Sequence, residues 1–346
     1  MSAWDIFLKD INENNLIKSG DRILLAVSGG PDSACMLHLF WRLSKKINIE
    51  LIAFNFDHGL RKESAKESLT VKKLSEKLKI KCVAEKIEVE KYAKENGISI
   101  ETAGRTLRYC RLEKAAKKFR CNKIATAHNA NDNAETVLMW LLRGSGGFSG
   151  IPQKRLLSEN TEIIRPVLSV KRKEIEKYVK KQKIPFCIDG SNFSQRYTRN
   201  RIRKNIIPAF ESINPSAVEH IYLLSKIQER ENAYLEQISI NSLKKCAKIS
   251  KNRILLDLTR FLRYNEAVRF RILKMLMPDK KYVLRINSVM ERILLKERAV
   301  YEISGEWKFT VKSGNKAVFE RIKNKQGSSP NVKEKRRKFV DRKSVV

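Results

Sequence analysis

Residues 21–33 read Asp-Arg-Ile-Leu-Leu-Ala-Val-Ser-Gly-Gly-Pro-Asp-Ser. The apolar run in the first half of this stretch predicts a buried strand, and the apolar spacing that begins at Asp32 predicts a helix to about Ser44. Two glycines, Gly29 and Gly30, separate the strand from the helix. The stretch therefore predicts a strand, a glycine turn and a helix in immediate succession.

Strand-like and helix-like segments continue to alternate along the chain. Further strands are expected at 49–56, 81–87 and 122–127, and further helices at 63–79, 100–120 and 132–142. This alternation predicts βαβ units and a parallel, Rossmann-like sheet of the α/β class. Ligands bind such sheets at the carboxyl ends of the strands, near the point where the strand order reverses. We therefore expect the functional residues directly after the strands.

The chain is expected to have two domains and a tail. Residues 1–212 hold the strand–helix alternation and form the expected catalytic domain. Within it, 144–160 is rich in Gly and Ser and is expected to be a mobile loop. Residues 213–322 are expected to form a smaller, mostly helical appendage, with helices to about Lys296 and a small sheet after it. Residues 323–346 are polar and basic and are expected to be a disordered tail.

The charge balance indicates a polyanionic partner. The chain has 346 residues, with 72 Lys and Arg against 38 Asp and Glu, which leaves a net charge of +34. A monomer of this charge repels itself, so the excess favours nucleic acid as a partner. The alternative is a basic surface that only keeps the chain in solution. Hydrophobic residues make up 42% of the chain, which is enough to bury a sizeable core.

The 6 cysteines are scattered and are expected to be reduced core residues. None forms a C-x-x-C pair, which argues against a zinc knuckle and a dithiol redox motif. The sequence shows no basic-then-apolar leader and no apolar run of 18 residues, so we expect neither a secretory signal nor a membrane span. A cytoplasmic protein is the resulting expectation. Its oligomeric state, a homodimer included, stays open.

The glycine turn carries the strongest chemical signal. Glycines let the backbone approach an oxyanion, and the N-terminus of the following helix offers unpaired N–H groups and a partial positive charge. The serines would add hydroxyl donors, and Asp32 could hold a metal ion on the phosphates. The alternative is an ordinary turn in which Asp32 only caps the helix. The candidate phosphate-binding residues are Ser28, Gly29, Gly30, Pro31, Asp32 and Ser33.

The motif Ser-Gly-Gly-x-Asp-Ser resembles the pyrophosphate-loop signature of the ATP pyrophosphatases, which cleave ATP between the α and β phosphates and adenylate an oxygen. Later segments are similar to the lysidine synthetase branch of that family across roughly residues 20–215. The Arg-Gly-Ser-Gly run and the Arg-Asn-x-Ile-Arg element best distinguish this branch from other members of the family. In order, the matching segments are Asp57–Arg61, Glu101–Tyr109, Ala125–Thr136, Leu141–Gly146, Arg165-Pro166, Asp189–Asn192 and Tyr197–Arg203.

The resemblance implies an activity and its partners. ATP, with Mg²⁺, would activate C2 of the wobble cytidine in the CAU anticodon of tRNA(Ile) and release pyrophosphate. The ε-amine of free L-lysine would then displace AMP. The amine is a cation until it attacks, so its site should contain carboxylates.

Roles can be placed on residues of the matching segments. Asp132 and Glu135 are three residues apart at a helix start, so they share a face and are expected to hold the lysine; the alternative is that they only complement the helix dipole. Arg105, with Arg108 one turn later, would neutralise phosphate charge, or form a solvated helix face. His128 would touch the α-phosphate, or be a structural histidine. The catalytic candidates are thus Asp32, Arg105, His128, Asp132 and Glu135.

Two more groups complete the expected site. Asp57 and His58 end the second strand, where an adenosine or metal contact is expected, and the alternative is a loop-capping aspartate. Arginine forks suit phosphates, and Tyr197 could stack on an unpaired base. The alternative for this group is a surface charge run with Tyr197 in a core. The expected RNA contacts are Tyr197, Arg199, Arg201, Arg203 and Lys204.

One position departs from the pattern of the resembled family, which usually carries paired histidines where this chain has His128 and Asn129. The change removes an imidazole that could contact phosphate and leaves His128 as the candidate. Three other functions stay open. A tRNA thiolation enzyme would need closely spaced reactive cysteines, which this chain does not show. An amidating synthetase would not explain the charge of +34. A non-catalytic protein of the same fold would bind RNA without releasing AMP.

Overall fold

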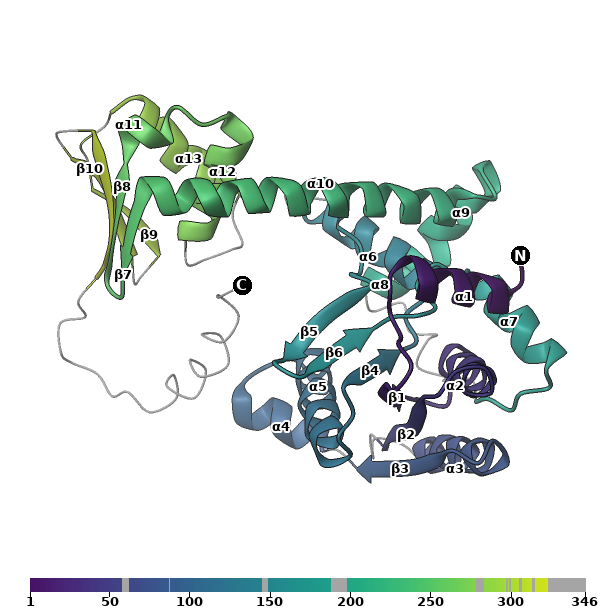
Figure 1. The fold of residues 1–346 in the computed structure, drawn as a ribbon. Coiled ribbons are helices and arrows are strands. Elements are labelled where there is room, and N and C mark those ends of the chain that lie inside the picture. The colour runs from purple at the N-terminus through teal and green to yellow at the C-terminus, as the bar shows by residue number, and fades with distance from the viewer. Residues whose placement is uncertain are drawn as a thin grey trace. The chain divides into compact units, whose positions relative to one another are not determined.

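The computed structural model describes residues 1–57, 62–86, 88–144, 149–187, 198–277, 283–296, 298, 300–304, 307–312 and 315–322. It describes only the backbone of Asp57, 62–66, 283–285 and 303–304. By its internal contacts the chain divides into two compact units, Met1–Glu231 and Asn232–Val346. The division falls inside one long helix, α10 (Ala217–Cys246), shown in Figure 1. The domain boundary expected near residue 212 stays a prediction.

The first unit is built on a six-stranded sheet with the order β3-β2-β1-β4-β6-β5. Neighbouring strands run parallel except for the edge pair β5 and β6. The strand order reverses between β1 and β4, so the carboxyl ends of these two strands meet at the switch point. The strands are β1 (Arg22–Ala26), β2 (Glu50–Asp57), β3 (Lys81–Lys86), β4 (Lys123–Thr126), β5 (Lys154–Ser158) and β6 (Thr161–Ile164).

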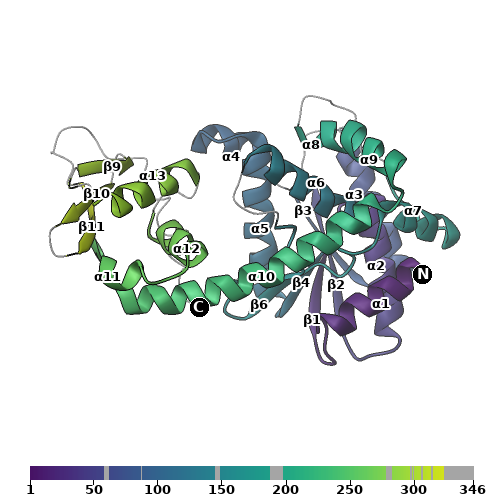
Figure 2. The ribbon, with the colours of Figure 1, turned by 90° about the horizontal axis from the view of Figure 1, so that it is seen from above.

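Helices cover both faces of this sheet (Figures 1 and 2). Side chains alternate between the faces of a strand, so Ile23 and Leu25 of β1 pack on one side and Leu24 on the other. The first face is covered by α1 (Ala3–Glu13), α2 (Pro31–Ser44), α3 (Lys62–Lys77) and α7 (Arg172–Lys181), and the second by α5 (Ile100–Lys118). The short helix α4 (Val89–Asn96) packs against α5.

Helix α6 (Ala130–Leu142) follows β4 and carries the remaining site residues. Its buried side packs against Ile202 and Ile207. These residues belong to a continuous helical segment made of α8 (Thr198–Arg201), the π-helical turn η2 (Ile202–Ile206) and α9 (Ile207–Ile213). The amide of Asn133 on α6 donates a hydrogen bond to Ser225 of α10 at 2.9 Å. Helix α6 is therefore held in place from two sides.

The second unit contains a five-stranded antiparallel sheet with the order β7-β8-β11-β10-β9. Its core joins the sheet to three helices and the C-terminal part of α10 through apolar side chains that include Phe261, Phe309 and Phe319. The elements are β7 (Ala247–Ser250), β8 (Arg253–Asp257), α11 (Leu258–Phe261), α12 (Glu266–Leu276), α13 (Val283–Leu294), β9 (Val300–Ser304), β10 (Trp307–Lys312) and β11 (Lys316–Arg321).

The expected α/β class with a parallel sheet is confirmed, and so is a further region of helices and strands. Two expectations are wrong. The Gly- and Ser-rich stretch 144–160 was expected to be a loop, but 154–158 forms the edge strand β5. Residues 247–257 were expected to be helical, but they form β7 and β8, which extend the second sheet. No helix among the described residues has the length and apolar character needed to cross a membrane.

Candidate active site

The glycine turn lies between β1 and α2, as the sequence predicts. Gly30 caps α2 and Pro31 is its first residue, so the helix begins inside the turn. The Ser33 hydroxyl donates to the Gly30 carbonyl at 3.0 Å and accepts from the Ser28 backbone N–H at 3.2 Å. These bonds fix the shape of the turn and leave the N-terminal amides of α2 directed into the site region.

Within this turn, Gly29 is the position least tolerant of substitution. Its φ is +93°, a conformation that disfavours any side chain. A Cβ atom here would lie 3.3 Å from Cβ of Glu67 on α3. The Gly29 carbonyl also accepts a hydrogen bond from the Cys187 backbone N–H at 2.9 Å. The turn is thus held between α3 and the segment that follows α7.

Asn129 joins the end of β4 to the start of α6. Its side-chain oxygen accepts from the Asp132 backbone N–H at 3.0 Å, and its own backbone N–H donates to the Asp132 carboxylate at 3.1 Å. This reciprocal pair is a capping box, which satisfies two N–H groups at the helix start. Asn129 is completely buried. Asn129, which differs from the histidine usual in the resembled family, is therefore the N-cap of α6. The spacing Asn-x-x-Asp in the sequence is typical of such a cap.

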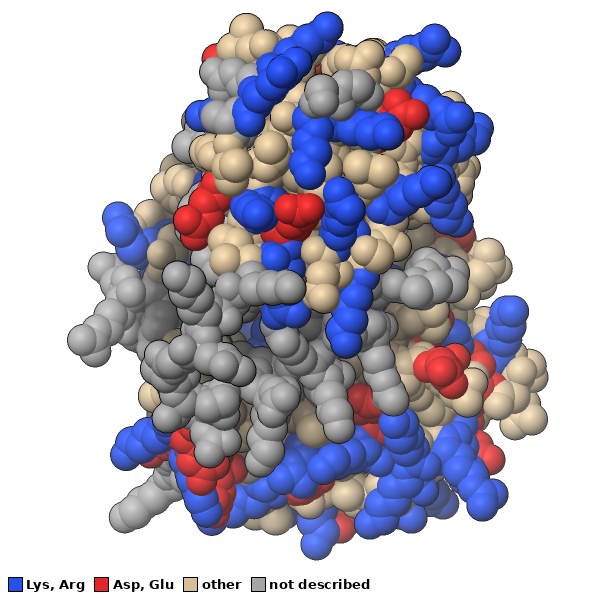
Figure 3. All heavy atoms as spheres, turned by 90° about the vertical axis from the view of Figure 1, so that its left-hand side faces the viewer, with Lys and Arg blue, Asp and Glu red and all other residues tan. Residues whose placement is uncertain are grey.

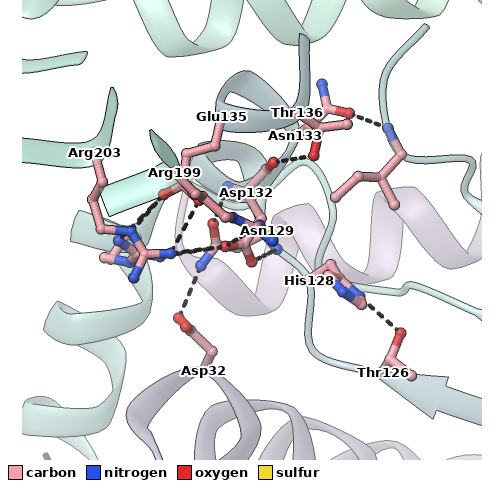
Figure 4. A network of polar contacts seen from close by, with 12 residues as sticks. Asp32, Thr126, His128, Asn129, Asp132, Asn133, Glu135, Thr136, Arg199 and Arg203 are labelled. Atoms are coloured by element: carbon pink, nitrogen blue, oxygen red, sulfur yellow. Dashed lines mark hydrogen bonds and ion pairs between the residues drawn. The ribbon is translucent and has the colours of Figure 1, made fainter. Parts of the chain in front are cut away.

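Asn129 also reaches the glycine turn. Its amide donates to Oδ1 of Asp32 at 3.0 Å, which links α6 to α2 (Figure 4). Burial and the nearby charge of Asp132 raise the pKa of Asp32 to about 6. An oxygen donor of this kind, beside a second carboxylate, is suited to a cation. Asp32 does not cap α2, whose N-cap is Gly30, and its carboxylate instead contacts α6 through Asn129.

Asp132 and Glu135 lie on the same side of α6, as their spacing predicts, but both are ion-paired with arginines (Figure 4). Glu135, whose side chain is 0% exposed, accepts from Nε of Arg199 at 2.7 Å and from Nε of Arg203 at 2.6 Å. Oδ1 of Asp132 lies 3.3 Å from Nη2 of Arg199 and 3.4 Å from Nη2 of Arg203. Arg172, at the start of α7, adds a longer contact of 3.5 Å to Asp132.

The structure thus brings two expected groups into one cluster. The carboxylates expected to hold lysine and two arginines expected to bind RNA are each other's partners. Arg172 belongs to the same cluster and was not anticipated, because nothing in the local sequence around it signals a site. Arg201 is exposed and Lys204 is partly buried, both on the same helical segment.

His128 follows β4 and lies among cations. Its Nδ1 is 3.0 Å from the Thr126 hydroxyl. Burial, followed by the charges of Arg165, Arg199, Arg108 and Arg105, lowers the pKa of His128 to about 3. The imidazole is therefore neutral near pH 7, and the four guanidiniums around it favour an anion. Arg165, which the sequence placed in a matching segment without a role, directly follows β6 at the same sheet edge.

The neutral His128 predicts a pH dependence of stability. Its pKa is 6.5 in the unfolded chain and about 3 in the fold, so the unfolded state binds the extra proton between these values. Stability from this residue is complete above pH 6.5 and is lost as the pH falls through that window. We expect His128→Asn to flatten the decline of the unfolding free energy between pH 6 and 4 by about 1 kcal/mol per pH unit, measured with urea. His220→Asn, at an exposed position, is the control; equal flattening in both variants would contradict the prediction.

A second basic group surrounds Tyr109 on α5. The guanidiniums of Arg105 and Arg155 lie 5.3 and 5.2 Å from the centre of its ring. Burial raises the pKa of Tyr109, but Arg105 and Arg165 outweigh it and lower the pKa. Both Arg105 and Arg108 are exposed. This group extends the positive edge of the site from β4 toward β6.

Some expected residues lie outside the described part of the chain, namely His58 and Tyr197, together with 145–146, 189–192 and the tail 323–346. Of Asp57 only the backbone is described, at the carboxyl end of β2. Within the described residues, no three His, Cys, Asp or Glu side chains gather in a way that would hold a metal ion.

The model of the family described as "PP-loop domain" matches residues 5–210, which is more than half of the chain. The chain belongs to the PP-loop family. The matched range includes the glycine turn between β1 and α2.

Relatives within this family have curated names. A tRNA(Ile)-lysidine synthase of Thermosipho africanus is 48% identical over 215 residues, which cover 62% of this chain and 50% of that protein. A tRNA(Ile)-lysidine synthase of Clostridioides difficile is 37% identical over 276 residues, covering 78% of this chain and 59% of that protein. The chain therefore spans between half and three-fifths of the length of these relatives.

A solved structure of the same fold is the tRNA thiolase NcsA of Methanococcus maripaludis, with a TM-score of 0.56 and 18% identity, covering 66% of this chain and 77% of that one. At this identity the similarity shows the fold alone. All six cysteines of the present chain are free.

Proposed function

We propose that this PP-loop protein is a tRNA(Ile)-lysidine synthase. The O2 oxygen of the wobble cytidine attacks the α-phosphorus of ATP, and pyrophosphate leaves. The ε-amine of free lysine then attacks C2, the bond from C2 to the adenylated oxygen breaks, and that oxygen leaves with AMP. The products are lysidine in the RNA, AMP and pyrophosphate. The names and identities of the relatives support this reaction.

One geometric observation carries the proposal. The glycine turn after β1 and the carboxylates of α6 after β4 lie at the carboxyl ends of neighbouring strands, and Asn129 connects them through Asp32. A reaction that first adenylates a base and then admits an amine needs an oxyanion site and an ammonium site close together. The glycine turn is proposed to supply the first of these sites and the carboxylates of α6 the second.

The glycine turn and the cations beside it are proposed to carry out the adenylation step. Backbone amides around Gly29 and Gly30, with the N-terminus of α2, would bind the leaving pyrophosphate. Arg105 and neutral His128 would stabilise charge that develops on the α-phosphate. Burial and the arginines around it keep His128 uncharged, so it would act as a hydrogen-bond donor rather than as an acid.

Asp32 fits a magnesium ion. It is an oxygen donor whose pKa is raised by burial and, to a smaller extent, by the carboxylate of Asp132, so a cation would relieve the repulsion between the two groups. Mg²⁺ is commonly held by one or two carboxylates, with phosphate oxygens and water completing the octahedron. When bound, the ion would neutralise phosphate charge. Asp57, at the end of the neighbouring strand β2, and His58 are proposed to contact the nucleotide.

Lysine is proposed to bind at Asp132 and Glu135. A buried carboxylate attracts an ammonium strongly, and Glu135 is completely buried at the end of the site. Both carboxylates are paired with arginines, so lysine must compete with a guanidinium.

RNA is proposed to bind the basic surface next to the site. Among the coloured residues of the face drawn in Figure 3, Lys and Arg predominate and Asp and Glu form smaller patches, which agrees with the net charge of +34 but does not locate an RNA site. Near the site, Arg201 is exposed on α8. Arg199 lies on the same short helix and Arg203 on the adjoining π-helical turn η2. Together with Tyr197 and Lys204, these residues are proposed to contact the anticodon loop. The need for tRNA, ATP and lysine places the proposed enzyme in the cytoplasm.

Salt dependence tests the RNA surface. We expect Arg201→Gln to weaken RNA binding and to make the slope of log K against log salt less steep by about 0.7, the loss of one phosphate contact. Filter binding of tRNA at several salt concentrations measures the slope. Lys94→Gln on α4 removes an exposed cation from a different helix and is the control. The RNA contact of Arg201 is excluded if the two variants show the same slope as the unchanged protein.

The decisive experiment is mass analysis of tRNA(Ile) with a CAU anticodon after incubation with ATP, Mg²⁺ and lysine. An increase of one lysine on an anticodon cytidine is the expected result. RNA binding without tRNA-dependent AMP release would identify a non-catalytic binder instead. Incorporation of sulfur would identify a thiolase, and either outcome would overturn the proposal.

A further inference from the structure

The guanidiniums around Tyr109 have no counter-charge. Arg105 and Arg155 lie 5.3 and 5.2 Å from the centre of the Tyr109 ring, and Arg165, which is 3% exposed, acts on the same phenol. Within the described part of the chain, no carboxylate forms an ion pair with any of these three arginines. Three like charges so close together repel one another, and burial strengthens the repulsion. An anion is therefore the partner that this group lacks.

Two buried donors of the group are also unpaired. Nε of Arg155 and Nε of Arg165 are buried and meet no hydrogen-bond acceptor among the described residues. Buried polar atoms in native proteins are almost always paired, so such an exception needs an explanation, of which a bound ion is one. The arginines beside α6 show the contrast, because Arg199 and Arg203 both donate to Glu135. That cluster is neutralised by the protein itself, whereas the group at Tyr109 stays positive.

The positive group is held in a fixed position. The backbone N–H of Arg165 donates to the Gln153 carbonyl at 2.9 Å, and the Arg165 carbonyl accepts from the Gln153 side-chain amide at 3.0 Å. The Arg165 guanidinium donates through Nη1 to the Pro152 carbonyl. These partners are neutral, so they orient the guanidinium without cancelling its charge. A cation that is oriented in advance suits an anion that must be placed accurately.

The place of the group on the sheet indicates which anion it receives. The glycine turn follows β1, His128 follows β4 and Arg165 follows β6, and neighbouring strands lie about 4.8 Å apart. The nucleotide contact proposed for Asp57 lies on the other side of β1, after β2. The nucleotide thus accounts for the sheet edge from β2 to β4. The edge beyond β4 is left for the other polyanionic substrate, the RNA.

We propose that Arg155 and the Tyr109 hydroxyl bind a backbone phosphate of the RNA beside the cytidine that is modified, and that the buried charge of Arg165 strengthens this contact. The inference rests on the proposed function and adds the contact that positions its RNA substrate. A guanidinium fork matches a phosphate, and a phenol whose pKa is lowered is a better hydrogen-bond donor.

A fixed phosphate would also fix the base. A ribonucleotide whose base reaches His128 carries a phosphate on each side of its ribose, and phosphate contacts set the register of a nucleic acid on a protein. Arg105, whose charge acts on both Tyr109 and His128, connects the phosphate contact to the reacting centre. The contact at the end of β6 would therefore present the cytidine to the activated nucleotide at the end of β4.

RNA binding in the absence of ATP and lysine tests the contact. The full chain is titrated with an anticodon stem–loop of tRNA(Ile) that carries the CAU sequence, by filter binding at several salt concentrations. We expect Arg155→Gln to weaken binding by about tenfold. We also expect it to make the slope of log K against log salt less steep by about 0.7. Tyr109→Phe loses only the hydroxyl and should weaken binding by about threefold at an unchanged slope.

The matched control is Arg111→Gln. Arg111 lies on α5 like Tyr109, but its guanidinium pairs with Glu85 at 2.7 Å and its side chain is 38% exposed. This variant removes the same charge and should leave the RNA affinity and the slope unchanged. Arg155→Lys keeps the charge without the fork, so it should keep the slope and lose part of the affinity, which a merely structural role would not predict. Urea unfolding checks that each variant is folded.

A neutral phosphate identifies the partner of Arg155. Stem–loops are made with a methylphosphonate in place of the phosphate on the 5′ or the 3′ side of the wobble cytidine. We expect the unchanged protein to bind one of these two RNAs about tenfold more weakly. Arg155→Gln should bind that RNA as well as it binds the unmodified stem–loop, because the two changes remove the same contact. The inference is refuted if the methylphosphonates weaken binding to both proteins equally, or to neither.

Two parallel measurements separate the possible failures. A non-hydrolysable ATP analogue should bind Arg155→Gln and the unchanged protein equally; weaker binding of the analogue with unchanged RNA affinity would assign the site to the nucleotide and overturn the inference. Lysidine formation by the unchanged protein, with RNA binding unaltered in Arg155→Gln, would overturn the phosphate contact alone. An absence of any lysine adduct, with the expected effects of Arg155→Gln on RNA binding, would overturn the proposed function and leave the phosphate contact standing.

Discussion

Glu135→Ala is expected to lower the free energy of unfolding by about 3 kcal/mol. Glu135 is fully buried and accepts hydrogen bonds from both Arg199 and Arg203, so its loss leaves two guanidiniums near the site without this acceptor. Removing one partner of a buried pair costs about 3–5 kcal/mol. We expect the lower end of this range because the side chains of Arg199 and Arg203 are 36% and 25% exposed and can be partly hydrated.

The matched control is Glu50→Ala. Glu50 pairs with Arg22 at 2.6 Å, the same distance that separates Glu135 from Arg203, but its side chain is 64% exposed. An exposed pair contributes at most about 1 kcal/mol. Urea unfolding at pH 7 measures both variants. Equal losses in the two would show that the buried cluster does not stabilise the fold as described.

Gly29→Ala is expected to reduce tRNA-dependent exchange of pyrophosphate into ATP by at least about a hundredfold. The φ of +93° strains any side chain at this position, and a Cβ would lie 3.3 Å from Cβ of Glu67. Either the turn or α3 must shift to accept the methyl group. A shift of the turn moves the amides that are proposed to bind pyrophosphate, and a small misplacement of such groups has large kinetic effects.

Gly20→Ala is the matched control, because it introduces a similar backbone strain at a position outside the glycine turn. Gly20 has a similar φ of +88°, but no heavy atom lies within 4 Å of a Cβ added there, and it precedes β1 rather than following it. We expect this variant to lose about 1 kcal/mol of stability and to keep the exchange activity. The role of the turn would be refuted by a Gly29→Ala protein that exchanges pyrophosphate within threefold of the unchanged protein, about the spread of routine assays.

The fold was largely predictable because its central elements have strong local patterns. The apolar runs of β1, β2 and β4 and the helical spacing of α2 and α5 lie in the sequence itself. The edge strand β5 and the pair β7 and β8 were not predictable in this way. They are short, and several of their residues are exposed, so their apolar spacing is weak and their strand structure depends on pairing with neighbours.

The sequence by itself determined which chemistry stands after each strand: a glycine turn after β1, and His128, Asn129, Asp132 and Glu135 after β4. Only the tertiary structure decided how those charges are paired. Glu135 and Arg199 are 64 residues apart, and no local pattern reports a contact across that distance. The pairing exists because α8 and η2 pack against α6 and bring guanidiniums to carboxylates that burial would otherwise leave without a counter-charge. A spacing in sequence can place two side chains on one face of a helix, but their partners come from whichever element the fold lays against it.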